Sequence, residues 1–396
     1  MTLRSRALSW LAVFLPLAAI VVVLSLTGAI SGPIEQTVIR NLILLIAVVG
    51  YYIFVGNSGV LSFGHVVFMV VGAYVTGILG MSPESRVLSI PGLPSLLRDL
   101  PQFTPFTACL LGGVVALVFA AALSVPMMRL AGVPAALTSF AVLQAVYVFV
   151  AHAQDITGAT GGLSGISPIG GVVPVLLTSL AAIGLALSYQ RSRWGLLLRA
   201  SREDAVAAAA VGINVHRQRT FAYILSGFVM GVAGGFYAEF LGTISPDTLY
   251  LSITFMILMM LVTGGQKSLS GAVIGCAFIA LVDWGLGEIQ SGVQVGAVNV
   301  KGPVGLAQVG LAVILLAVLI WRPRGLTGGR EIRLGRLGAR TTAGRGHEKD
   351  SVAGSRQLQA PENTVETNTA QSAGIDMTST DRDPTETGIE TTNRPL

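Results

Sequence analysis

Long apolar stretches recur along the chain and are separated by shorter polar segments. A helix needs about 20 apolar residues to cross the roughly 30 Å hydrocarbon core of a bilayer. The pattern predicts ten such helices, near residues 8–30, 37–55, 60–80, 106–125, 134–152, 169–189, 219–242, 248–263, 268–286 and 304–321. The chain is therefore expected to be an all-α polytopic membrane protein, with its first span retained rather than cleaved as a signal peptide.

The composition supports this fold class. Charged residues make up 11% of the chain, against about 25% in a soluble domain. Glycines also recur every four residues, as at Gly227, Gly231 and Gly235, which places them on one helix face. This spacing lets helix backbones approach closely, so it predicts a tightly packed bundle.

Positive charge gathers in alternate connections between the predicted spans. The residues are Arg4, Arg6, Arg129, Arg191, Arg193, Arg199, Arg202, Arg217, Arg219, Lys267, Arg322, Arg324 and Arg330. With ten spans, all of these positively charged residues fall on one side of the membrane. With an odd number of spans they would fall on both sides. Arginine-rich short loops face the cytoplasm. We therefore expect both chain termini to be cytoplasmic, in the plasma (inner) membrane of a bacterium, a source that the excess of Arg over Lys suggests.

The composition changes after Trp321, where an Arg/Gly-rich stretch leads into a polar segment without aliphatic clusters. Such a segment buries too little apolar surface to offset its ordering entropy. The sequence predicts a membrane domain over residues 1–325 and a disordered cytoplasmic tail over residues 326–396.

Motifs for chemistry within this chain are absent from the sequence. It contains no GxxxxGK[ST] phosphate loop, no HExxH and no GxSxG, and its two cysteines have no metal-ligand spacing. The candidate ionisable residues inside the spans are His65, His152, Glu239 and Asp283, most of them near predicted span ends. They form no evident proton relay, so no catalytic residue, metal site or cofactor is expected, and energy for transport would come from other subunits.

The most informative connection between two predicted spans lies in the segment "SRWGLLLRASREDAVAAAAVGINVHRQRTFAY". Ser201 is expected to cap a short helix, with Glu203 and Asp204 in its first turn. Gly212 then takes the left-handed conformation that ends the helix. A rigid helix covered mainly by methyl groups fits a groove on a partner protein, and a plain surface helix is the alternative.

This connection resembles the coupling loop of bacterial ABC importer permeases. The segment "NLILLIAVVGYYIFVGNSGVLSFGHVVFMVVGAY" resembles the early block of the branched-chain amino acid permease family, in particular its LivM-type subunit. The matching positions are Gly56, Gly59, Ser62, Gly64, His65, Phe68, Gly72, Ala73 and Tyr74. "TGGLSGI", "GVAGGFYAEFLGTISPDT" and "GGQKSLSGAVIG" continue the match in the family's order.

The resemblance implies a pore-forming subunit of an ATP-driven importer for branched-chain or other neutral amino acids. Its partners would be a second, LivH-like permease subunit, two cytosolic ATPases that bind the ATP, and an extracytoplasmic binding protein, with no nucleic acid. Residues 190–218 would form the coupling loop, with Arg199, Arg202, Glu203, Asp204, Ala208, Ala209 and Gly212 as its candidate coupling residues.

Several departures leave the substrate open. The family's acidic residue after the TGG pair is Leu163 here, and its usual Gly-Leu-Gly-Ser is Gly265–Ser268, with Gln266 and Lys267 inside. Urea and short amides are served by close relatives. A stand-alone secondary transporter or channel is the alternative from another class, although the sequence shows no coupling-ion site or filter.

A second candidate site surrounds the Gly56–Gly59 break between two spans. Irregular backbone at membrane depth is tolerated where it is buried in protein or lines a watery path. His65 is expected one turn into the next helix, where its ring would donate to a backbone carbonyl or, alternatively, contact passing substrate. The candidate pathway residues are Asn57, Ser62, Gly64, His65, Thr160, Gly161 and Gly162.

Overall fold

The computed structural model describes residues 3–28, 32–130, 132–291, 293–295, 298–300, 303, 305–329 and 331. All of them belong to one unit, Met1–Leu337. Most of the predicted tail, from residue 332 onward, lies outside the described residues. The prediction that the tail is disordered concerns these residues and stays a prediction.

Each of the ten predicted spans coincides with a helix. These helices are α1 (Leu3–Gly28), α2 (Gly32–Ser58), α3 (Val66–Gly80), α6 (Pro105–Met127), α7 (Val133–His152), α9 (Val172–Arg191), α12 (Val215–Leu241), α13 (Leu251–Gly264), α14 (Leu269–Ser291) and α15 (Leu306–Trp321). Among the described residues, seven helices are long and apolar enough to cross a membrane, and the apolar parts of α1, α3 and α15 are shorter. The all-α polytopic fold is confirmed.

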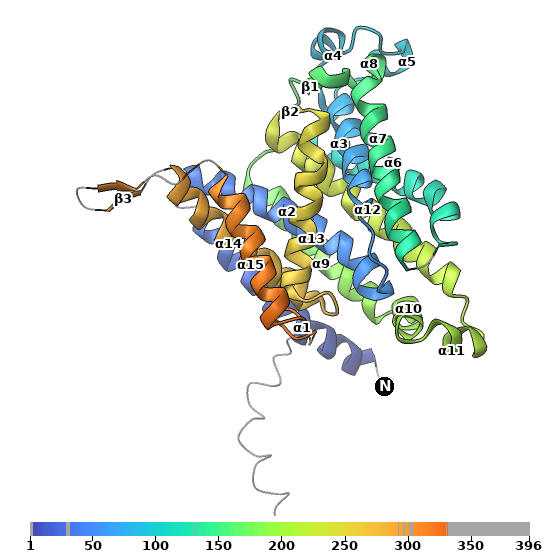
Figure 1. The fold of residues 1–396 in the computed structure, drawn as a ribbon. Coiled ribbons are helices and arrows are strands. Elements are labelled where there is room, and N and C mark those ends of the chain that lie inside the picture. Colours follow the sequence, from blue (N-terminus) through green and yellow to red (C-terminus); the bar gives the residue numbers. More distant parts are fainter. Residues whose placement is uncertain are drawn as a thin grey trace, which may run out of the picture. The chain divides into compact units, whose positions relative to one another are not determined.

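The shorter elements lie at the two ends of the bundle (Figure 1). One end carries α10 (Arg193–Glu203) and α11 (Ala205–Ala210). The other carries α4 (Pro83–Ser89), α5 (Ser95–Arg98), α8 (Gln154–Thr157), η1 (Ala159–Gly161), η2 (Pro246–Leu249), β1 (Leu163–Ser164) and β2 (Thr243–Ile244). Strands β1 and β2 pair antiparallel, with Leu163 opposite Ile244. Between α14 and α15, β3 (Val293–Val295) pairs antiparallel with β4 (Val298–Val300).

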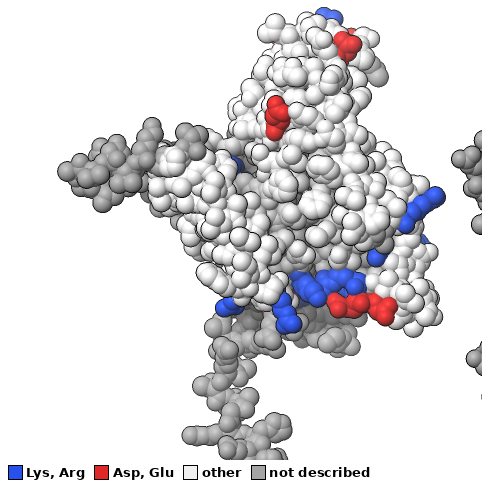
Figure 2. All heavy atoms as spheres, in the orientation of Figure 1, with Lys and Arg blue, Asp and Glu red and all other residues white. Residues whose placement is uncertain are grey.

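The two ends differ in charge. Lys and Arg gather at the end that carries α10 and α11, which we call the arginine-rich end (Figure 2). The first turn of α1 and the last turn of α15 also lie there (Figure 1). The other end, which we call the opposite end, has fewer cations, among them Arg86 of α4 and Arg98 of α5.

The centre of the bundle is formed by α2, α3, α6 and α12, which are packed backbone to backbone. A Cβ atom placed on Gly72 would lie 2.0 Å from the carbonyl oxygen of Gly231, and one on Gly234 would lie 2.0 Å from that of Met69. Gly227, Gly231 and Gly235 likewise leave no room for a side chain against α6 and its neighbours. The close packing predicted from the glycine spacing is confirmed.

Helix α7 is more loosely attached than the central helices. Its buried residues are Ala135, Ser139, Leu143 and Val150, so one narrow stripe faces the bundle. Its other sides are exposed in the single chain, including Gln144 and the apolar Leu137 and Phe149.

At the opposite end, one buried arginine organises the connection between α3 and α6. The guanidinium of Arg86 donates to the carbonyl oxygens of Leu79, Leu97, Leu100 and Pro101. Burial lowers its pKa. The carbonyl of Leu79 belongs to the last turn of α3, where backbone acceptors are otherwise unsatisfied and favour a cation. The arginine therefore fixes this connection to the end of α3.

Residues 326–329 and Glu331, which we call the C-terminal strap, return onto the arginine-rich end. The amide of Leu326 donates to the Thr263 carbonyl at 2.8 Å. The carboxylate of Glu331 accepts from the amides of Leu269 and Ser270, the first residues of α14, at 2.8 and 3.1 Å. The boundary predicted at residue 325 is therefore too early, because the strap is part of the bundle. Sequence reasoning missed it, since it is held by hydrogen bonds to distant residues rather than by an apolar run.

Candidate functional site

The predicted coupling loop, residues 190–218, contains two short helices, α10 and α11. A single residue, Asp204, separates them. The hydroxyl of Ser192 caps α10 by accepting from the Gly195 amide at 3.3 Å. One carboxylate oxygen of Asp204 caps α11 by accepting from the amides of Val206 and Ala207, both at 2.9 Å. Acidic side chains stabilise this position because the first amides of a helix have no intrahelical acceptor.

The prediction that Ser201 caps the helix is wrong. Ser201 lies in the last turn of α10, where its hydroxyl donates to the Leu198 carbonyl at 2.8 Å. Asp204 takes the capping role instead of lying in the first turn. Both residue types cap helices well, so the choice depends on where α10 ends.

The end of α11 is as predicted. Gly212 has a φ of +85°. Its amide donates to the Ala209 carbonyl, and the Ile213 amide donates to the Ala208 carbonyl, both at 3.0 Å. This pair of hydrogen bonds is the Schellman motif, which satisfies carbonyls that would otherwise lack partners.

The two candidate alanines on α11 face different ways. Ala208 is buried against the protein, whereas Ala209 is exposed. Val206 and Val211 are exposed by 81% and 77%. The small apolar surface that a partner could contact therefore consists of Val206, Ala207, Ala209, Ala210 and Val211, and Ala208 lies outside it.

The loop is held firmly to the membrane helices. The guanidinium of Arg202 donates to the Gly56 carbonyl of α2 at 2.5 Å and pairs with Glu203 at 3.0 Å, which lowers the pKa of the Glu203 carboxyl. Arg199 donates to the Gln190 carbonyl at the end of α9 at 2.8 Å. These contacts join α10 to both α2 and α9.

A second anchor joins α10 to α12. The Trp194 ring stacks on Phe221 with centroids 5.3 Å apart, and the guanidinium groups of Arg193 and Arg217 lie over it at 5.2 and 5.4 Å. Cations over the face of an indole ring are attracted by its quadrupole. Displacement of the loop would therefore act directly on the start of α12.

The predicted break at Gly56–Gly59 is shorter than expected. Helix α2 continues through Ser58, and the side-chain amide of Asn57 donates to the Ile53 carbonyl one turn earlier at 3.0 Å. The chain leaves the helix at Gly59, whose φ is +72°. A Cβ atom on Gly64 would lie 2.1 Å from the Ser139 carbonyl, so this turn packs directly on α7.

His65 occupies the position before α3 rather than one turn inside it. Its ring stacks on Phe54 at 4.9 Å and meets Tyr223, Tyr51 and Phe68 edge-on at 4.9 to 5.5 Å. Neither ring nitrogen has a hydrogen-bond partner among the described residues. The predicted donation to a backbone carbonyl is therefore wrong, and the ring is packed among aromatic groups.

The candidate pathway residues do not form one site. Asn57, Ser62 and His65 are buried near the arginine-rich end. Thr160 and Gly161 are exposed at the opposite end, where a Cβ atom on Gly162 would lie 2.0 Å from the Ile244 carbonyl. The two groups lie at the two ends of α3, a helix of 15 residues and so about 22 Å long.

Sequence reasoning missed an ion pair inside the membrane helices. Arg40 of α2 donates to Asp283 of α14 at 3.2 Å. The signal was a single arginine inside an otherwise apolar span, and such residues are rare and commonly functional.

A polar cluster at the opposite end was also missed. The Tyr147 hydroxyl of α7 donates to Asp247 at 2.7 Å, and the Tyr147 ring stacks on Tyr250 at 4.1 Å. The Tyr250 hydroxyl donates in turn to Gln144. The cluster joins α7 to the start of α13.

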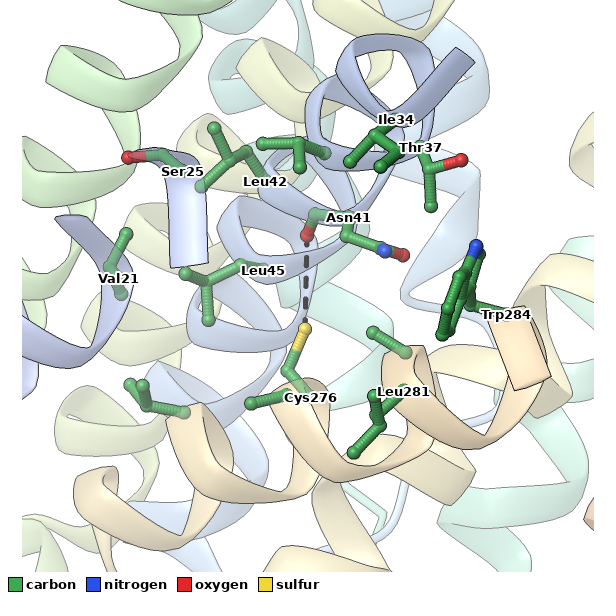
Figure 3. A pocket seen from close by; sticks show the side chains of 14 residues that line it. Val21, Ser25, Ile34, Thr37, Asn41, Leu42, Leu45, Cys276, Leu281 and Trp284 are labelled. Atoms are coloured by element: carbon green, nitrogen blue, oxygen red, sulfur yellow. Dashed lines mark hydrogen bonds between the residues drawn. The ribbon is translucent and has the colours of Figure 1, made fainter. Parts of the chain in front are cut away.

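An apolar groove of about 340 Å³ lies between α1, α2 and α14 (Figure 3). Leu42, Leu45 and Leu281 line it, and the Asn41 side chain points toward Trp284 (Figure 3). The Cys276 thiol donates to the Asn41 carbonyl at 3.8 Å. Like the other cysteine, Cys109, it is buried and unpaired by a disulfide.

Ten apolar helices with an arginine-flanked loop at one end are typical of a polytopic membrane protein. The pattern of the family described as "Branched-chain amino acid transport system / permease component" matches residues 33–320. The chain belongs to this family, whose members are transport permeases. The predicted family resemblance is confirmed.

Individual relatives share 25–33% sequence identity with the chain. The probable branched-chain amino acid transport permease LivH of Methanocaldococcus jannaschii is 33% identical over 185 residues, 47% of this chain and 54% of that protein. The high-affinity branched-chain amino acid transport permease LivM of Escherichia coli K12 is 25% identical over 321 residues, 72% of this chain and 68% of that protein. The match spans about half the length of the archaeal LivH and over two thirds of LivM. No solved structure matches the chain significantly.

Proposed function

We propose that the chain is the pore-forming permease subunit of an ATP-driven ABC importer. The observation that carries the proposal is the helix pair α10–α11, an exposed small-residue surface held by Arg202 to α2 and by Trp194 to α12. A part that passes force from a soluble ATPase to membrane helices must be held to those helices, and these contacts supply that attachment.

The proposed assembly contains this chain, a LivH-like second permease subunit, two cytosolic ATPases and an extracytoplasmic binding protein. Both LivM and LivH proteins are among the relatives, which supports a pair of related permease subunits. The arginine-rich end would face the cytoplasm, because positive charge marks that side. The cargo would be branched-chain or other neutral amino acids, as the names of the relatives indicate.

The test places a charge on the contact surface of α11. Ala209→Glu puts a charged side chain at an exposed position, so folding and membrane abundance should be normal. Uptake of leucine and recovery of the ATPase with the permease should each fall by about tenfold, the effect of 1.4 kcal/mol lost at an interface.

Ala209→Ser is the matched control, because its small side chain fits the same space, and it should behave as the wild type. Gly212→Val should resemble Ala209→Glu, since a β-branched residue resists the left-handed conformation. Full uptake and undiminished ATPase recovery with Ala209→Glu would remove the coupling role.

A further inference from the structure

The ion pair between Arg40 and Asp283 joins three helices at membrane depth. One guanidinium nitrogen of Arg40 donates to Asp283 of α14, and another contacts the sulfur of Met256 in α13 at 3.7 Å. Arg40 lies eight residues after the start of α2, and Asp283 lies eight before the end of α14. At 1.5 Å per residue the pair is about 12 Å inside the opposite end.

The pair is only half enclosed. The Arg40 and Asp283 side chains are 38% and 20% exposed in the single chain. Among the described residues, the Asp283 carboxylate accepts a hydrogen bond through Oδ2, and the second acceptor for Arg40 is a thioether, which accepts weakly. Both side chains of the pair are therefore partly open at the surface of the single chain.

Contact with lipid hydrocarbon is energetically unfavourable for the Arg40 guanidinium and the Asp283 carboxylate. Ionised side chains inside a membrane face a partner protein or a water-filled cavity rather than lipid. The surface continues along α13 through the half-exposed Met256 and Met259. The polar cluster of Tyr147, Asp247 and Tyr250 lies at the start of α13. The cluster and the ion pair are therefore both found along the first half of α13.

We infer that Arg40 and Asp283 form a binding station for the two charged groups of an α-amino acid passing along α13. The inference rests on the proposed function and names where the permease contacts its cargo. The guanidinium of Arg40 takes the carboxylate of the amino acid, and the Asp283 carboxylate takes its ammonium group. Both groups of the cargo are attached to one carbon, so neighbouring opposite charges on the protein match them.

The chemistry of the pair suits weak, transient binding of an amino acid in transit rather than high-affinity binding. Arginine binds carboxylates through paired donors in a fixed plane. Because Asp283 partly neutralises Arg40, the cargo is held weakly and can leave, as conduction requires. The flexible Met256 beside the pair can accommodate aliphatic side chains of different shapes.

The first experiment asks whether water reaches the pair in the assembled transporter. Met256→Cys is compared with Ile257→Cys, the next residue on α13, which is 1% exposed. Both are made with Cys109→Ala and Cys276→Ala, and the full complex in lipid nanodiscs is treated with a water-soluble thiol reagent. We expect the cysteine at position 256 to react and leucine-loaded binding protein with ATP to slow the reaction severalfold, while position 257 stays unreactive. No reaction at position 256 in any state would overturn the inference, because lipid or the partner subunit would then cover the pair.

The second experiment separates cargo binding from helix pairing. The double variant Arg40→Asp with Asp283→Arg restores the ion pair but reverses the charges that the cargo meets. We expect near-normal abundance with leucine import reduced by about tenfold or more, while Arg98→Leu, which removes an arginine exposed at the opposite end, leaves import unchanged.

The outcomes distinguish this inference from the proposed function. Full import by the swapped pair would show that the pair only joins helices and would overturn the inference alone. Failure of the wild-type complex to import leucine with ATP would instead overturn the proposed function. If the double variant does not assemble, the inference is tested by the reaction of Met256→Cys with the thiol reagent alone.

Discussion

The guanidinium of Arg202 donates to the carbonyl oxygen of Gly56 at 2.5 Å, across 146 positions of the chain. This hydrogen bond fixes the last turn of α10 to the end of α2, just before α2 ends at Ser58. The aliphatic part of the same side chain lies over Gly59, where a Cβ atom would be 2.5 Å from Arg202 Cγ. The last turn of α10 and the start of the turn toward α3 therefore form one contact.

Loss of this contact should uncouple the transporter. Arg202→Met keeps most of the aliphatic part of the side chain and removes its donors, which costs about 1.5–3 kcal/mol for a hydrogen bond from a charged group. Gly59→Ala should have a similar effect, because the added methyl group displaces Arg202 and the backbone has a positive φ. The measurement is leucine import per ATP hydrolysed in proteoliposomes with all subunits, and we expect it to fall while hydrolysis continues.

Arg193→Met is the control for this prediction, since Arg193 lies over Trp194 and its contact is on the other side of α10. It should reduce the ratio less than Arg202→Met. Equal losses in the two variants would show that the charge of the loop, not the contact with Gly56, determines coupling.

The orientation of the bundle can be measured with single cysteines. Ala209→Cys lies on α11 at the arginine-rich end, and Leu88→Cys lies on α4 at the opposite end, where Leu88 is 86% exposed. If the arginine-rich end is cytoplasmic, an impermeant thiol reagent added to intact cells should label position 88 and not position 209. Permeabilised cells should show labelling at both, which controls for reactivity. The reverse pattern in intact cells would invert the orientation.

The backbone-to-backbone packing should make Gly234 sensitive to substitution. A Cβ atom there would lie 2.0 Å from the Met69 carbonyl, which cannot move without shifting α3. Gly234→Ala should therefore destabilise the protein by about 1–3 kcal/mol, the usual cost of overpacking. Gly285→Ala is the matched helical control, because no described atom lies within 4 Å of its Cβ position. The measurement is the fraction of monodisperse protein left after heating in detergent, and equal stability of the two variants would contradict the packing.

The C-terminal strap should contribute to stability, whereas the later tail should not contribute to transport. Glu331→Ala removes the acceptor for the amides of Leu269 and Ser270 at the start of α14. Loss of a helix cap costs about 0.5–2 kcal/mol, so the variant should aggregate at lower temperature than the wild type. Deletion of residues 350–396 should leave both stability and import unchanged. A wild-type melting profile for Glu331→Ala would show that the strap is not needed.

Apolar runs were sufficient to predict ten apolar helices, because the length and composition of a membrane helix depend on the bilayer rather than on tertiary contacts. The start of α11 could not be predicted in the same way. Ser201 and Asp204 both suit a cap, and the choice follows from where α10 ends, which the local sequence does not show. The end of α11 was predicted because only Gly212 can take the required conformation at low cost.

Long-range contacts account for what was missed. Asn57 was expected in a break, yet its side chain donates to Ile53 and α2 continues. Arg40 and Asp283 are separated by 243 positions, so the sequence shows two isolated charges and not a pair. The position of a lone charge in an apolar span is visible in a sequence, but its partner is not.

Helix α12 begins next to the coupling loop and runs for 27 residues, about 40 Å, to the opposite end. Along the way its glycines touch the backbones of α3 and α6 with no layer of side chains between them. Side chains can change rotamer and absorb a displacement, whereas backbones in contact cannot. A displacement of α12 would therefore carry α3 and α6 with it rather than be taken up between the helices.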